Sequence, residues 1–192
     1  MQMNLRDLLH TKRDAVISQW FESIASTYPA ETARFIQNDP GRFSNPVGST
    51  IRDGMQAILA HLASDDAPDA AIPFLDTIIR IRAIQEFTPA EALRFLFDLK
   101  DIIRKEFGPA VAEYGLAAEV ESLFGRIDTL SLLAFDIFMK CREKLYDIKA
   151  NELRNMTFRL LQQANLVTEA RTDDAASQED RFLKISRKEV SR

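Results

Sequence analysis

The sequence is poor in the residues on which most metal sites and disulfide frameworks depend. Its 192 residues include one cysteine, Cys141, and two histidines, His10 and His61. A single cysteine cannot form an internal disulfide, so a reducing compartment, the cytoplasm, is the expected setting. The same scarcity leaves too few ligands for a zinc site of the usual Cys and His type with its supporting partners. We expect neither a metal nor a cofactor.

Glycine clusters, long apolar runs and an excess of basic residues are also missing. The six glycines stand singly, so no glycine-rich phosphate loop is present. No segment approaches the roughly 18 consecutive apolar residues of a membrane helix, and the first residues reach charges too early for a signal peptide. The net charge of −4 and the pI near 5.3 argue against binding to a phosphate backbone. Neither membrane insertion nor nucleic acid binding is expected.

No arrangement of side chains typical of catalysis is evident. The carboxylates stand beside basic residues at helical spacing, which is typical of a solvated helix face rather than of a paired acid and base. Cys141 lies on an apolar stripe, where a small buried hydrophobic residue is a better interpretation than a reactive thiol. The sequence therefore predicts a protein that is not an enzyme.

Helix-forming residues and apolar residues spaced three and four apart are abundant, and they predict an all-α fold. We expect helices over residues 5–27, 31–37, 48–63, 73–87 and 89–107, and a long helix over residues 117–169. Residues 1–169 form the predicted domain, and the polar segment 170–192 is predicted to be disordered. The apolar stripe of the last helix runs further than one globule of this size can cover, which predicts a homodimer.

His61 borders the apolar stripe of the helix over residues 48–63. A haem ligand in a globin-like pocket would lie in such a place, and so would a half-buried structural histidine. A protein that binds haem or a small apolar ligand is therefore the alternative function.

Arg82 and Gln85 continue the buried line of the helix over residues 73–87, although both are polar. A guanidinium directed into a core must find acceptors, because unpaired burial is costly. We expect Arg82 and Gln85 to form a buried polar latch, with Gln85 bound to the turn at Thr88. The expected partner of Arg82 is a carboxylate, with three candidates: Asp98, Asp101 and Asp136. In the alternative, the Arg82 side chain extends past the core edge to water.

The tetrapeptide Thr88-Pro89-Ala90-Glu91 has the form of a capping box and marks the start of a helix. Thr88 is the expected N-cap, and Pro89 suits the first helical position. The helix before it must therefore end close to Phe87.

The segment from Ile81 to Leu93, together with Phe95 to Lys100, resembles the N-terminal domain of RsbRD-type proteins, bacterial regulators related to the stressosome sensor RsbR. The resemblance covers about residues 5 to 165. Further matching positions lie at Trp20 and Tyr28, at Phe43 to Gly48 with Asn45 and Pro46, at Thr88 and Pro89, and at Leu160 to Gln163.

The resemblance implies a globin-like helical bundle that senses a signal or binds another protein, dimerises, and passes a conformational change down its last helix. In the relatives that helix usually leads into a STAS domain, which carries phosphoacceptor threonines. The residues after 169 are too few for such a domain, and Thr168 and Thr172 match no phosphoacceptor motif. We therefore expect a homodimeric signalling domain that acts through a separate, unidentified protein partner.

Overall fold

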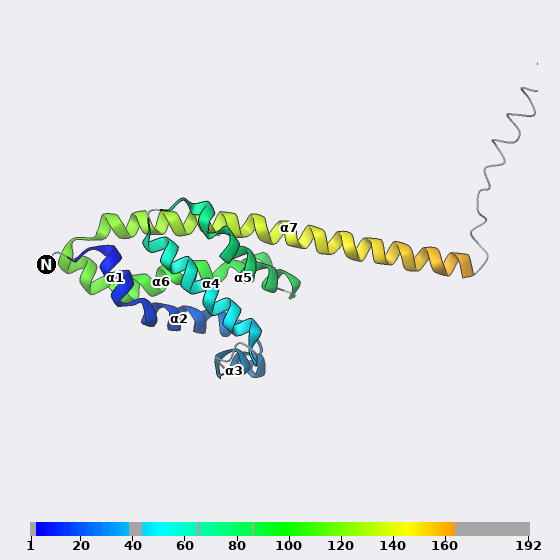
Figure 1. Cartoon of the computed structure of the whole chain (residues 1–192), viewed down its shortest axis with the longest axis horizontal. Coiled ribbons are helices and arrows are strands. Elements are labelled where there is room, and N and C mark those ends of the chain that lie inside the picture. The colour runs from blue at the N-terminus through cyan, green and yellow to red at the C-terminus, as the bar shows by residue number, and fades with distance from the viewer. Residues whose placement is uncertain (1–2, 39–43, 65, 86, 164–192) are drawn as a thin grey trace, which may run out of the picture. The chain divides into compact units, whose positions relative to one another are not determined.

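The computed structural model describes residues 3–38, 44–64, 66–85 and 87–163, and these residues are helical apart from short connections (Figure 1). No strand occurs among them. The all-α prediction and the long C-terminal helix are confirmed. The helices are α1 (Leu5–Thr11), α2 (Arg13–Ala25), α3 (Ala30–Asn38), α4 (Pro46–Ala63), the 3-10 turn η1 (Pro68–Ala71), α5 (Ile72–Ile84), α6 (Pro89–Tyr114) and α7 (Ala117–Gln163).

The chain divides into two compact units, residues 1–146 and residues 147–192. The first unit holds the hydrophobic core, to which α7 contributes one face, from Leu123 to Phe138. The described part of the second unit, residues 147–163, is helical, and all of its residues are exposed. The predicted tail over residues 170–192 lies outside the described residues.

Trp20 joins α2 to α6 in the centre of the core. Its side chain is completely buried, and its indole Nε1 donates a hydrogen bond of 2.6 Å to the carbonyl oxygen of Phe95. The rings of Trp20 and Phe95 are also stacked, with centroids 5.9 Å apart. A buried indole needs an acceptor for its N–H, and the backbone of α6 supplies it.

Two helix boundaries differ from the prediction. The first predicted helix is broken at Lys12, which ends α1 and begins α2, and whose ammonium donates to the carbonyl oxygen of Glu106 on α6 at 3.2 Å. Neither glycine nor proline marks this break, which follows from tertiary packing. Helix α6 continues past Pro109 and ends at Gly115, where φ is 71°. The missing N–H of Pro109 is tolerated because this last part of α6 faces solvent.

Asn45 begins α4 and ties it to α3. Its side-chain oxygen accepts the N–H of Gly48 at 2.8 Å, and its Nδ2 donates to the carbonyl oxygen of Ile36 at 2.8 Å. A Cβ on residue 48 would clash with the Asn45 amide, so any larger residue there would displace this cap. Pro46 occupies the first turn of α4, where its missing N–H costs nothing.

Replacing Asn45 with alanine should lower the free energy of unfolding by about 2 kcal/mol, because a helix cap and a buried hydrogen bond are lost together. The matched control is Ser49→Ala in the same turn, whose hydroxyl makes an exposed bond to the Pro46 carbonyl. It should change stability by less than about 0.5 kcal/mol. Urea unfolding followed by circular dichroism measures both, and equal effects would contradict the capping role of Asn45.

Candidate functional site

Arg82 is a cation in the centre of the first unit. Its side chain has 0% relative exposure. The guanidinium Nε donates to the carbonyl oxygen of Ala92 at 3.1 Å, and Nη2 donates to the carbonyl oxygen of Glu91 at 2.9 Å and to Thr27 Oγ1 at 3.1 Å. Nη1 is buried and has no hydrogen-bond partner among the residues that the structure describes. One side chain of α5 therefore reaches the end of α2 and the first turn of α6.

Aromatic rings complete the surroundings of this guanidinium. Its central carbon lies 4.1 Å from the ring centroid of Phe87 and 5.6 Å from that of Tyr28, within the range of cation–π attraction. The Tyr28 hydroxyl donates to Gln85 Oε1 at 2.8 Å. We call Thr27, Tyr28, Arg82, Gln85 and Phe87 the Arg82 cluster. It joins the ends of α2 and α5 to the beginning of α6.

Burial shifts the pKa values of the two titratable members of the Arg82 cluster. Desolvation lowers the pKa of Arg82, and the guanidinium nevertheless keeps its proton because its ordinary pKa is so high. Desolvation raises the pKa of the Tyr28 phenol, although the nearby Arg82 charge acts in the opposite direction. The cluster thus holds one buried positive charge and a neutral phenol.

The predicted carboxylate partner of Arg82 was wrong. Asp98 pairs with Arg94 at 3.4 Å, and Asp101 pairs with Arg104 at 2.7 Å. Asp136, the third candidate, is exposed on α7. Among the described residues, the acceptors of Arg82 are two backbone carbonyls and the Thr27 hydroxyl, none of which carries a net charge.

The predicted bond between Gln85 and the turn at Thr88 was also wrong, since the Gln85 side chain binds Tyr28 on a different helix. The capping box itself is present. Thr88 Oγ1 accepts the N–H of Glu91 at 3.3 Å, and Glu91 Oε2 accepts the N–H of Thr88 at 2.9 Å. The bonds that Thr88 donates to this carboxylate, from its N–H and from its hydroxyl, lower the pKa of Glu91. Pro89 is the first residue of α6.

His61 is buried near the end of α4. Arg126 donates to three carbonyl oxygens there, those of His61 at 2.9 Å, Leu62 at 3.0 Å and Ser64 at 2.6 Å. Burial and the Arg126 charge lower the pKa of the His61 imidazole, against the smaller effect of Asp66. His61 does not line any of the hollows described below. This arrangement gives no support to the haem alternative.

The lowered pKa of His61 makes stability depend on pH. The unfolded imidazole, with a pKa of 6.5, binds its proton first as the pH falls, so protonation favours the unfolded chain. We expect His61 to contribute stability that is present above the unfolded pKa of 6.5 and is lost as the pH falls through the lowered pKa of the folded state. In urea unfolding above and below this range, His61→Gln should lose less stability than the parent as the pH falls. The same loss in the variant and the parent would contradict the prediction.

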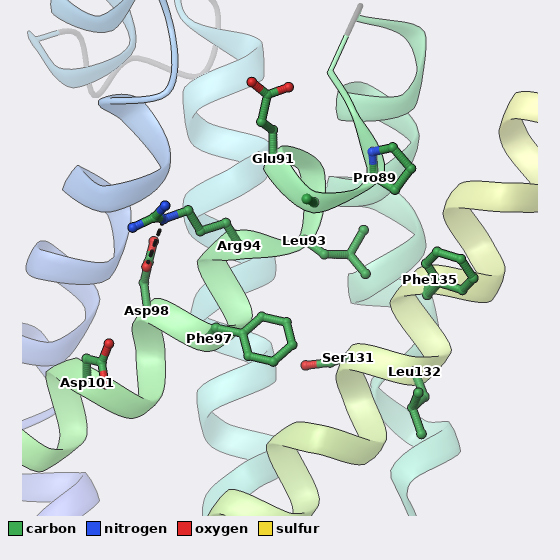
Figure 2. Close-up of a pocket in the computed structure, with 11 residues that line it drawn as sticks. Pro89, Glu91, Leu93, Arg94, Phe97, Asp98, Asp101, Ser131, Leu132 and Phe135 are labelled. Atoms are coloured by element: carbon green, nitrogen blue, oxygen red, sulfur yellow. Dashed lines mark ion pairs between the residues drawn. The ribbon is translucent and has the colours of Figure 1, made fainter.

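A second feature is an apolar surface between α6 and α7, around a hollow of about 830 Å³. Figure 2 shows Leu93 and Phe97 projecting from α6 toward the part of α7 that carries Ser131, Leu132 and Phe135. Phe97 is 51% exposed, Leu132 71% and Phe135 45%. We call Leu93, Phe97, Leu132 and Phe135 the α6–α7 surface.

The sequence prediction missed this surface because it followed a different stripe of the last helix. The predicted stripe runs through Ile127, Leu130 and Ala134, which are buried in the core, and ends with Leu153 and Leu160, which are exposed. Apolar residues that recur every seven positions on the same helix are exposed along its length, and the prediction contained the last two of them but not the first three: Leu132, Met139, Tyr146, Leu153 and Leu160. A seven-residue apolar repeat is the signal that would have found it.

Neither a membrane segment nor a metal site emerges from the described part of the chain. None of its helices combines the length and the apolar character that a bilayer span requires. Among the same residues, no three His, Cys, Asp or Glu side chains gather in a way that would hold a metal ion.

Comparison with known proteins yields one family and one distant relative. An uncharacterised protein of Archaeoglobus fulgidus is 26% identical over 145 residues, which cover 73% of this chain and 83% of that protein. No solved structure matches the chain. The model of the family described as "RsbT co-antagonist protein rsbRD N-terminal domain" matches residues 14–153, a range that contains the Arg82 cluster, the Asn45 cap and the α6–α7 surface. The chain therefore belongs to the RsbRD N-terminal domain family, a family of stressosome-related signalling and sensor domains.

Proposed function

We propose that the chain is a non-enzymatic cytoplasmic signalling domain that forms a homodimer and transmits a conformational change to a protein partner. The family supports signalling as the class of function. The observation that carries the proposal is the α6–α7 surface, where Phe97, Leu132 and Phe135 are exposed around one hollow. Contiguous exposed apolar area of this kind is typical of protein interaction sites.

A second copy of the chain is the proposed occupant of this surface. Each copy supplies the same aromatic and aliphatic side chains, which suits the self-complementary contact of a two-fold dimer. Aromatic residues are also the ones enriched at the centre of such interfaces. The exposed seven-residue repeat of α7 is the pattern by which two helices pack along their length.

The Arg82 cluster has a structural role in this proposal. Its hydrogen bonds connect the ends of α2 and α5 with the first turn of α6. Helix α6 also carries Leu93 and Phe97 of the proposed interface. We propose that the cluster acts as a polar latch that keeps α6 in register with α2 and α5.

Cross-linking of an equal mixture of ¹⁴N- and ¹⁵N-labelled chains tests the proposal, because a mixed-isotope link proves contact between two copies. We expect mixed-isotope links between lysines beside the exposed face of α7, Lys140 and Lys144, and none at Lys12, which pairs with Glu106. Links within single chains only, under conditions where those lysines react, would contradict the proposed dimer.

A further inference from the structure

The first unit contains another hollow, of about 410 Å³, between α1, the first residue of α2 and the end of α4. Its apolar lining comes from Leu9, Leu59, Ala60 and Ala63, and its polar lining from Arg6, His10, Arg13 and Ser64. A smaller hollow of about 230 Å³ shares Arg6, Leu9, Ala63 and Ser64 with it and therefore adjoins it. The larger volume lies within the range of about 300–1,000 Å³ that is common for small-molecule sites.

The ionisable side chains that line the larger hollow are basic, and Asp66 stands beside it, where its carboxylate accepts the Ser64 hydroxyl at 2.6 Å. Of the described residues that line it, Arg6 and Arg13 are cations, His10 is the other ionisable group, and no acidic side chain is present. The chain as a whole carries a net charge of −4, so this concentration of basic groups departs from the general surface. An apolar hollow with a basic rim favours an anion that has an apolar body.

Arg126 compensates partial negative charge at the end of α4 that would otherwise repel an anionic ligand. The carbonyl oxygens at the C-terminal end of a helix carry partial negative charge and would repel an anion. At the end of α4, those of His61, Leu62 and Ser64 all accept hydrogen bonds from Arg126. Among the described residues that line the smaller hollow, one carries a carboxylate, Glu119, and it accepts the N–H of Leu5 at 3.1 Å. An anionic group is therefore favoured in the larger hollow, away from Glu119.

We propose that the larger hollow binds a small organic anion, a carboxylate attached to a short apolar chain. The carboxylate lies beside His10 and Arg13, and the apolar chain covers Leu9, Leu59, Ala60 and Ala63. The inference does not depend on the proposed homodimer, because none of the α6–α7 surface residues lines this hollow. It gives the signalling domain a site for a chemical signal.

Titration of the full-length, ¹⁵N-labelled chain with octanoate, followed by NMR, tests the proposal. Saturable shifts are expected at residues of α1 and of the end of α4. Neutral 1-octanol and acetate should each bind at least about tenfold more weakly, since one lacks the charge and the other the apolar body. Equal binding of octanoate and octanol, or saturable octanoate shifts confined to α6 and α7, would overturn the proposal.

Two substitutions at exposed positions test whether octanoate binds in the larger hollow, and they leave the core unchanged. Arg13→Gln removes a cation and should weaken octanoate binding about fivefold or more. Ala60→Leu should abolish it by filling the hollow. The control is Arg80→Gln, which removes a cation of α5 outside the hollow and should leave binding unchanged. Unchanged binding in both Arg13→Gln and Ala60→Leu would refute the site.

A glutamate-rich peptide that binds there, with no binding of octanoate, would assign the hollow to an acidic protein partner instead.

Discussion

Replacing Arg82 with alanine should lower the free energy of unfolding by about 2–4 kcal/mol, one of the two largest effects that we expect from changes to this chain. The substitution removes a fully buried side chain and leaves a cavity. It also removes the cation–π contact with Phe87 and the hydrogen bonds to α6 and Thr27. No buried carboxylate is left unpaired, so the loss comes from packing and hydrogen bonds rather than from an isolated charge.

Two further variants separate burial from charge. Arg80→Ala, on the exposed side of the same helix, breaks only a surface pair with Asp76 and should cost well under about 1 kcal/mol. Arg82→Met keeps most of the buried volume and removes the desolvation cost of a buried cation that is held by uncharged acceptors, so it should stay within about 1.5 kcal/mol of the parent. Urea unfolding measures all three, and equal small losses for Arg82→Ala and Arg80→Ala would contradict the structural role of Arg82.

The second large effect concerns the proposed interface. The double substitution Leu132→Glu and Phe135→Glu should raise the dissociation constant of the homodimer by about 100-fold or more, because two charges would have to be buried at its centre. Both side chains are exposed in the single chain, so its fold should survive. Sedimentation velocity across a range of concentrations measures the constant.

The control for the double variant is Phe74→Glu, which places a charge at an exposed phenylalanine of α5 outside the α6–α7 surface. It should leave the dissociation constant unchanged. Circular dichroism should show the same helix content for all variants. A double variant that associates as tightly as the parent would exclude this surface as the interface.

The start of α6 and the inward position of Arg82 could be predicted from the sequence, because helix capping and helical periodicity depend on residues that are close together in the chain. The pattern Thr88-Pro89-Ala90-Glu91 predicts the start of α6, and the structure contains both bonds of that capping box. The buried line of α5 points to an inward position for Arg82, where the structure places it. The acceptors of Arg82 could not be predicted in this way. They are the carbonyl oxygens of Glu91 and Ala92 and the Thr27 hydroxyl, which the packing of α5 against α6 and the end of α2 brings to this guanidinium.

Tertiary packing also explains the remaining differences. The break at Lys12 has no glycine or proline to mark it, and α6 continues through Pro109 although proline usually ends a helix. The α6–α7 surface was missed because α7 carries two apolar stripes, and the sequence does not show which one the core covers. The basic hollow joins residues far apart in the chain, such as Arg13 and Ala60, which no local pattern connects.

The most direct test of the proposed homodimer is the mass of the unmodified chain in solution. Light scattering coupled to size exclusion, at tens of micromolar, should give twice the chain mass of 21.8 kDa. The same measurement on the Leu132→Glu and Phe135→Glu double variant should give the mass of a single chain. A parent protein that remains at 21.8 kDa over this concentration range would contradict the account.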